Sequence, residues 1–112
     1  MATTTKYGNK KSGGYDSRRE KRRATDLFYL QKAGEISDLR EQVAFELVPS
    51  QYETVDGRKK CVERAVNYVA DFVYNDKDGK LVVEDTKGFR TKDYIIKRKL
   101  MLWLHGIAIR EV

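Results

Sequence analysis

Two aspartates and one lysine are the residues whose types and spacing could do chemistry together. Asp71 ends the segment YVAD, and Asp85 and Lys87 lie in VVEDTKG after thirteen intervening residues. All three are set in the most apolar stretches of the chain, where an unpaired charge is costly. The alternative is that the aspartates are turn or sheet-edge residues and that Lys87 forms a weak surface ion pair. The apolar setting favours a shared site.

Carboxylates with no His or Cys beside them suit a hard divalent cation such as Mg²⁺, for which Mn²⁺ can substitute. Mg²⁺ usually completes its coordination shell with water and substrate phosphate. Such an ion can polarise a phosphoryl oxygen and lower the pKa of bound water, and an ammonium group stabilises the charged transition state. These residues therefore predict hydrolysis of phosphodiesters. A chain of 112 residues builds too small a core for a large organic cofactor, and none is expected.

Two strands must deliver these side chains. The run 65–74, rich in Val, Tyr and Phe, predicts a long central strand, and residues 80–87 predict a second strand after the turn NDKDG at 75–79. Side chains alternate along a strand, so Asp85 and Lys87 should share a face, with Thr86 on the other.

The register of this hairpin decides which acid meets Asp71. An even register, for example Asn75 opposite Gly79, places Asp71 across from Val83 and diagonal to Asp85. An odd register brings Glu84 to Asp71 instead, because a slip of one residue turns every side chain to the other face. The sequence leaves both registers open.

The remaining pattern predicts two helices and further strands around a small mixed sheet. The expected elements are a helix from Asp16 or Ser17 to Ala33, alternation from Gln42 to a hairpin turn at Asp56-Gly57, a helix from Thr91 to before Gly106, and a last strand at 107–112. The order α-β-β-β-α-β indicates an α/β domain over residues 16–112, and residues 1–15 read as a flexible basic arm.

The net charge of +6 is unevenly distributed along the chain. Residues 1–23 hold eight basic and two acidic side chains, and residues 87–99 hold six basic and one acidic. Two basic segments around an acidic centre would suit a polyanion such as DNA, although a solubilising tail and a solvated helix face are the alternative. The candidate DNA contacts are Lys6, Lys10, Lys11, Arg18, Arg19, Arg22, Arg23, Arg90, Lys92 and Lys97.

The second helix is apolar around most of its circumference, which favours a second copy of the chain as its cover and predicts a homodimer. The alternative cover is the stems of its lysines together with the arm. No apolar stretch approaches the ~20 residues needed to cross a bilayer, and residues 1–11 are polar and basic. A lone cysteine suits a reducing compartment. We therefore expect a cytoplasmic protein without a membrane segment.

Asp71 with Asp85-x-Lys87 and the order of elements together resemble the PD-(D/E)XK nuclease superfamily, which implies a restriction-endonuclease-like core. In that superfamily a Glu on the first core helix often completes the site, and Glu20 matches it here. A capping box from Ser17 to Glu20 competes with this role. The resemblance also implies that Asp71 and Asp85 hold the metal, with the Thr86 carbonyl as a further ligand, and that Lys87 positions the attacking water.

More closely, the chain resembles a family of short phage and prophage proteins along nearly its whole length, through KYGNKK, the SxxE helix, AGEI, FELxP, ADFVY and VVEDTKG. With its short length and helical Glu it is similar to archaeal-type Holliday junction resolvases, which are dimers that cut four-way DNA junctions. Two departures are Ala70, where the superfamily usually has Pro, and Asp85, where Glu is commoner. A phage protein in the cytoplasm of a bacterial host is implied.

These observations predict a magnesium-dependent DNA endonuclease that resolves four-way junctions or other branched DNA. One alternative is a phage nuclease with a different task, such as nicking or end trimming. A second alternative is a DNA-binding protein that keeps the fold without catalysis.

Overall fold

The computed structural model describes residues 17–112. The basic arm expected over residues 1–15 lies outside the described residues, as do Lys6, Lys10 and Lys11. Among residues 17–112, neither helix is long and apolar enough to cross a membrane.

The first helix, α1 (Arg18–Lys32), begins and ends where local sequence signals place it. The Ser17 side chain accepts a hydrogen bond from the backbone N–H of Glu20, and Gly34 follows the last turn with a φ of 79°. Ala24 and Leu27 form its buried face. The prediction of a helix from about residue 17 to residue 33 is therefore confirmed.

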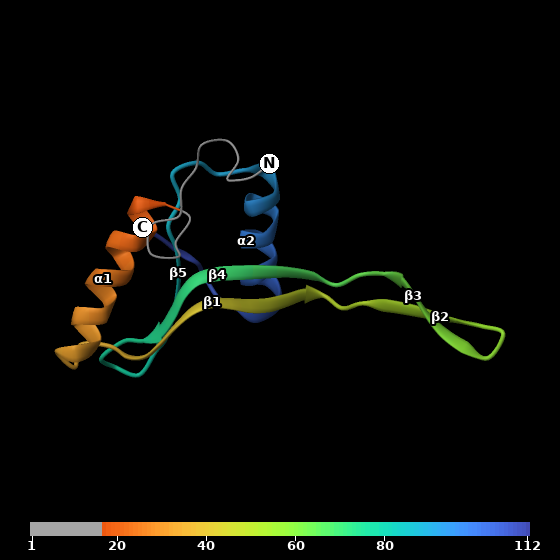
Figure 1. Ribbon diagram of the computed structural model, residues 1–112, viewed down its shortest axis with the longest axis horizontal. Helices are drawn as coiled ribbons and strands as arrows, with labels where there is room; N and C mark the ends of the chain where they lie inside the picture. Colours follow the sequence, from red (N-terminus) through yellow and green to blue (C-terminus); the bar gives the residue numbers. More distant parts are fainter. Residues whose placement is uncertain (1–16) are drawn as a thin grey trace.

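A four-stranded mixed sheet forms the centre of the protein (Figure 1). Its strands, in spatial order, are β1 (Ser37–Val48), β4 (Val66–Asn75), β5 (Leu81–Asp85) and β6 (Arg110–Glu111). Strand β4 runs antiparallel to both β1 and β5, and β6 lies parallel to β5. The predicted mixed sheet is present, although its last strand is shorter than the expected 107–112.

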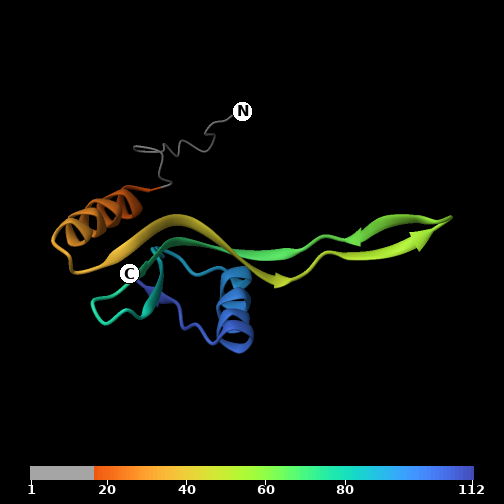
Figure 2. The same cartoon turned by 90° about the horizontal axis from the view of Figure 1, so that it is seen from below.

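The two helices cover opposite faces of this sheet (Figure 2). On one face Leu27 of α1 packs with Phe72 of β4. On the other face Met101 of α2 (Lys92–His105) packs with Val73 and Val83. Helix α2 starts at its Thr91 cap and ends before Gly106, as its sequence predicts. Each helix thus fixes one face of the strands that carry the candidate site.

The chain has two more strands than expected, because the first hairpin is divided. Strand β1 ends before Pro49, which cannot donate to a sheet ladder, and the chain then forms a separate two-stranded hairpin of β2 (Gln51–Val55) and β3 (Arg58–Glu63). Asp56 and Gly57 form its turn, both with positive φ. The order is therefore α-β-β-β-β-β-α-β, and the hairpin extends away from the sheet as an arm (Figures 1 and 2).

Candidate functional site

The register between β4 and β5 brings Asp71 and Asp85 together. Phe72 pairs with Glu84 and Asn75 with Leu81, so the register is even. The pairing of Asn75 with Gly79 that we used as an example is wrong, because the turn takes in residues 76–80 and is closed by a hydrogen bond from the Asp76 N–H to the Lys80 carbonyl. Continuing the register by one step places Asp71 directly across from Asp85 rather than diagonal to it.

Asp71 is held by the residue that follows Asp85. Its Oδ2 accepts hydrogen bonds from both the backbone N–H and the hydroxyl of Thr86, at 2.9 and 2.8 Å. Thr86 was expected to act through its carbonyl as a metal ligand, and the structure shows that its amide and hydroxyl orient Asp71. One carboxylate oxygen is thereby fixed, and the end of β5 is joined to β4.

Asp85 is a buried carboxylate with only 2% of its surface exposed. Its Oδ2 accepts a hydrogen bond from the Tyr68 hydroxyl at 2.7 Å and lies 3.3 Å from the Lys87 ammonium. Burial, together with the adjacent Asp71 carboxylate, raises the pKa of Asp85 to about 7, although the hydrogen bond from Tyr68 and the charge of Lys87 lower it. Two carboxylates therefore meet in a site whose protein groups do not fully compensate their charge.

Lys87 is fixed in place by an aromatic ring and by the first helix. Its ammonium lies 4.4 Å from the centre of the Tyr94 ring, at the start of α2. The Arg19 guanidinium of α1 donates a hydrogen bond to the Lys87 carbonyl at 3.0 Å. The short segment after β5 is thus positioned from both helices, with the ammonium directed at Asp85.

Glu20 reaches the same region from α1, through a residue that the sequence reasoning did not select. Glu20 is buried, and its Oε2 accepts a hydrogen bond from the Gln42 side-chain amide at 3.0 Å. The same amide nitrogen lies 3.5 Å from Oδ1 of Asp71. Ser17 caps the Glu20 amide while the Glu20 carboxylate faces inward, so the capping and inward-facing roles coexist.

Gln42 has an unusual backbone conformation, with a φ of 54°. This left-handed region favours glycine, and a residue held there costs on the order of 1–3 kcal/mol. Such strain collects at functional sites, because the surroundings must hold the residue in place. A positive φ leaves no mark in the sequence at a glutamine, so no local signal could have identified Gln42.

A depression of about 260 Å³ opens next to Asp85. Its lining includes Asn67, Tyr68, Lys87, Tyr94 and Lys97. Two ammonium groups and two phenol rings beside a carboxylate pair could accept a phosphate and the sugar or base attached to it. A strand tyrosine is more often part of the core than a ligand, so the sequence alone does not single out Tyr68.

The carboxylate pair fits a hydrated Mg²⁺, although residues 17–112 contain no group of three or more His, Cys, Asp or Glu side chains arranged around one point. Mg²⁺ commonly binds through one or two carboxylates and retains several waters. The raised pKa of Asp85 beside Asp71 is the electrostatic sign of a site that a cation would complete. Glu20 stands behind Gln42 rather than against the pair, which suits an indirect role better than direct coordination.

Glu84 lies on the opposite face of β5 and has a different function. Its carboxylate is fully buried. It accepts hydrogen bonds from Nε and Nη2 of Arg23, at 2.8 and 2.6 Å, and a further one from the Tyr74 hydroxyl. The Arg110 guanidinium lies 4.0 Å away. This cluster ties α1 to the sheet and fixes β5, so it supports the site from behind.

The predicted DNA contacts differ in their availability. Arg18, Arg19, Arg22 and Lys92 are exposed and Lys97 lines the depression. Arg23 is engaged by Glu84, and Arg90 is paired with Glu111 at 2.7 Å. The carboxylates that hold Arg23 and Arg90 are far from them in sequence, so charge counting could not separate these two from the available cations.

One family model, described as a protein of unknown function (DUF1064), matches residues 4–105. The chain belongs to this family. The match covers the site residues from Glu20 to Lys87 as well as the β2–β3 hairpin. No curated protein and no solved structure gave a significant match.

Proposed function

We propose that this DUF1064 protein is a metal-dependent DNA endonuclease with a restriction-endonuclease-like core. The observation that carries the proposal is the placement of Asp71 opposite Asp85, with the Lys87 ammonium 3.3 Å from the second carboxylate. A purely structural ion pair between Asp85 and Lys87 would not require a second carboxylate, Asp71, beside the buried Asp85. Hydrolysis at a phosphodiester uses such a pair with a cation.

In this mechanism Asp71 and Asp85 would hold Mg²⁺ or Mn²⁺, and the bound cation would polarise the scissile phosphate and lower the pKa of a water. Thr86 keeps Asp71 oriented through its two hydrogen bonds. Lys87, steadied by the Tyr94 ring, directs the attacking water and stabilises charge that develops on the phosphate. Glu20 positions Asp71 through Gln42.

The DNA backbone would lie along the exposed cations near the start of α1 and over the depression at the start of α2. Arg18, Arg22 and Lys92 would bind phosphates, and Lys97 would bind the phosphate closest to the site. These contacts fix the position of the backbone without reading sequence. Binding should weaken steeply as salt is added.

We further propose that the substrate is branched DNA, most specifically the four-way junction, and that the enzyme acts as a homodimer in the cytoplasm of a bacterial host. A junction offers two symmetric strands, so two copies of the site would cut both. Helix α2 leaves Ile96, Leu102 and Trp103 exposed, Trp103 to 84%, and a second copy would cover them. Sedimentation of the wild type against Trp103→Glu tests the dimer, and a monomeric wild type would overturn it.

The test of the activity is cleavage of labelled DNA with Mg²⁺, with Mn²⁺ and with EDTA. Four-way junction, linear duplex, flap and single strand should be compared at equal concentration. We expect symmetric nicks near the crossover that need the cation and are lost in Asp85→Asn and Lys87→Ala. Glu35→Gln, an exposed carboxylate paired with Lys77, serves as the matched control and should cut normally.

Each other outcome has a defined meaning. Cleavage that is equal or faster on duplex, flap or single strand would replace junction resolution with nicking or end trimming while keeping the nuclease. Tight binding of junctions without any cut in either metal would overturn the nuclease and leave a DNA-binding protein.

A further inference from the structure

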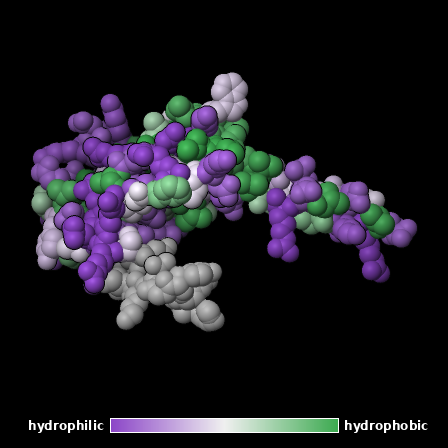
Figure 3. Space-filling model, turned by 90° about the horizontal axis from the view of Figure 1, so that it is seen from above, coloured by the Kyte–Doolittle hydropathy of each residue, from purple (hydrophilic) through white to green (hydrophobic). Residues whose placement is uncertain are grey.

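We propose that the β2–β3 hairpin is a DNA-binding arm that enters a groove of the duplex about one helical turn from the bond that is cut. This proposal takes the position of the DNA from the proposed function, on which it rests. It adds a second DNA-contact surface beyond the candidate site. The arm projects from the sheet as a narrow ribbon (Figures 1 and 3).

The hairpin buries none of its residues in the domain. Every position of β2 and β3 is exposed, and the two strands form a sheet of their own. An isolated two-stranded ribbon is at best marginally stable in water. Such an element gains nothing for the core, which indicates that its surface meets a partner.

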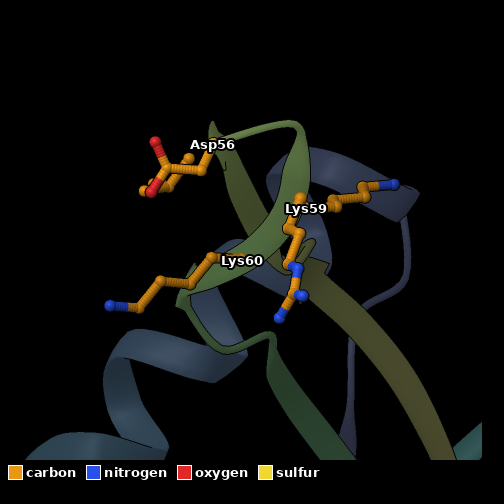
Figure 4. A pocket seen from close by; sticks show the side chains of 5 residues that line it. Asp56, Lys59 and Lys60 are labelled. Carbon is orange, nitrogen blue, oxygen red and sulfur yellow. The ribbon is translucent and has the colours of Figure 1, made fainter.

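The end of the arm carries three consecutive cations, Arg58, Lys59 and Lys60, and Arg64 follows β3. None of these four lies within ion-pair distance of a carboxylate in the part of the chain that the structure describes. Lys59 instead lies 4.5 Å from the centre of the Tyr52 ring. Figure 4 shows the long side chains of this end extending outward around a shallow hollow.

The three acids of residues 51–64 do not cancel this pattern. Asp56 occupies the first position of the turn, where a φ of 51° favours Asp or Asn. Glu53 lies directly across the ladder from Lys60 without coming within ion-pair distance of it, and Glu63 lies at the base of the arm. The face carrying Tyr52, Thr54 and Lys59 combines an aromatic ring, a hydroxyl and an ammonium, all of which can contact phosphate and sugar.

The arm has the dimensions for a groove and the length to reach it. A two-stranded ribbon fits the ~12 Å width of the major groove. Arg58 precedes Asp71 by thirteen residues, which at ~3.3 Å per strand residue spans at most about 43 Å. Taken along a duplex at ~3.4 Å per base pair, this is up to about 12 base pairs.

The connection between arm and sheet is closed by a hydrogen bond across its two strands. The Ala65 N–H donates to the Ser50 hydroxyl at 3.0 Å, where β1 and β4 give way to β2 and β3. The two crossing strands are thereby held together at the base of the arm. The arm therefore starts from a fixed point at the end of β1 and the beginning of β4.

The experiment measures binding by fluorescence anisotropy in EDTA. It compares two four-way junctions whose duplex branches are 8 or 20 base pairs long. The variant is Arg58→Ala/Lys59→Ala/Lys60→Ala. The control removes the same charge at the other end of the sheet, as Lys32→Ala/Lys77→Ala/Lys80→Ala. We expect the arm variant to bind the long junction about tenfold more weakly and the short junction within about twofold of the wild type.

The dependence on salt gives a second measurement. On the long junction, the slope of log Kd against log salt should fall by up to about 3 in the arm variant, one for each lost phosphate contact. An equal loss on both lengths, or no loss on either, would overturn the arm contact. Dissociation of a dimer by the arm variant in sedimentation would also overturn it and make a second copy the partner.

The two proposals fail in different ways. A wild type that binds junctions by a length-dependent arm contact but cuts nothing refutes only the nuclease. A wild type that cuts, with arm variants that bind both lengths as it does, refutes only the arm.

Discussion

Removal of the Asp85 charge should stabilise the metal-free protein at alkaline pH. The pKa of Asp85 stands at about 7 instead of 3.8 in the folded state. At ~1.4 kcal/mol per pH unit, the ionised carboxylate destabilises the metal-free fold by up to about 4 kcal/mol at pH 8. Because the folded pKa is raised, the wild type does not carry this penalty below pH 3.8. The penalty grows as pH rises from 3.8 towards 7.

Asp85→Asn keeps the shape and the acceptor for Tyr68 but cannot ionise. We expect it to unfold with a free energy about 1–3 kcal/mol above that of the wild type at pH 8 in EDTA, less than the upper bound because side chains and water relax around a buried charge. That gain corresponds to a rise in Tm of roughly 5–20 °C. At pH 4 the difference should shrink towards zero.

Magnesium should narrow this difference in stability. A cation bound at ten times its Kd adds about 1.4 kcal/mol to the wild type and nothing to a variant that has lost the site. The assay is thermal unfolding at pH 4 and pH 8, with EDTA or Mg²⁺, with Glu35→Gln as the control. The reasoning is refuted if Asp85→Asn is less stable than the wild type in EDTA at pH 8, or if Mg²⁺ stabilises both proteins equally.

Three further predictions follow from the contacts around the site. Arg23→Ala leaves the buried Glu84 carboxylate without its bidentate partner and should lower the free energy of unfolding by about 3–5 kcal/mol in urea denaturation, whereas a loss below 1 kcal/mol would show that the pair is unimportant. Gln42→Gly should be at least as stable as Gln42→Ala, because glycine adopts the positive φ without strain. Both variants lose the bridge to Glu20 and should cut DNA slowly. An alanine variant more stable than the glycine variant would contradict backbone strain at this position. Hydrogen bonds from Arg90, Tyr94 and Arg98 lower the pKa of Glu111 to about 2. Glu111→Gln should therefore be less stable than the wild type at pH 7, and the difference in stability should disappear as pH falls from about 4.5 towards 2. A difference that stays constant across an acid titration would refute this.

The sequence by itself determined the local elements of this protein. Ser17 and Thr91 begin the helices, Gly34 and Gly106 end them, and Asp56-Gly57 makes a hairpin turn, because caps and turns depend on residues a few positions apart. The three charged residues of the candidate site were also visible, since charge inside an apolar strand is a conspicuous local feature.

Only the tertiary structure decided which of these residues meet. The even register follows from the closure of the turn at 76–80 and from packing on both faces of the sheet, and it separates Asp85 from Glu84. Gln42 and the Arg23–Glu84 pair join segments far apart in the chain. The independent arm arises because Pro49 interrupts a ladder that alternation alone would continue. Contacts between distant segments depend on how whole elements pack, and no short stretch of sequence contains that information.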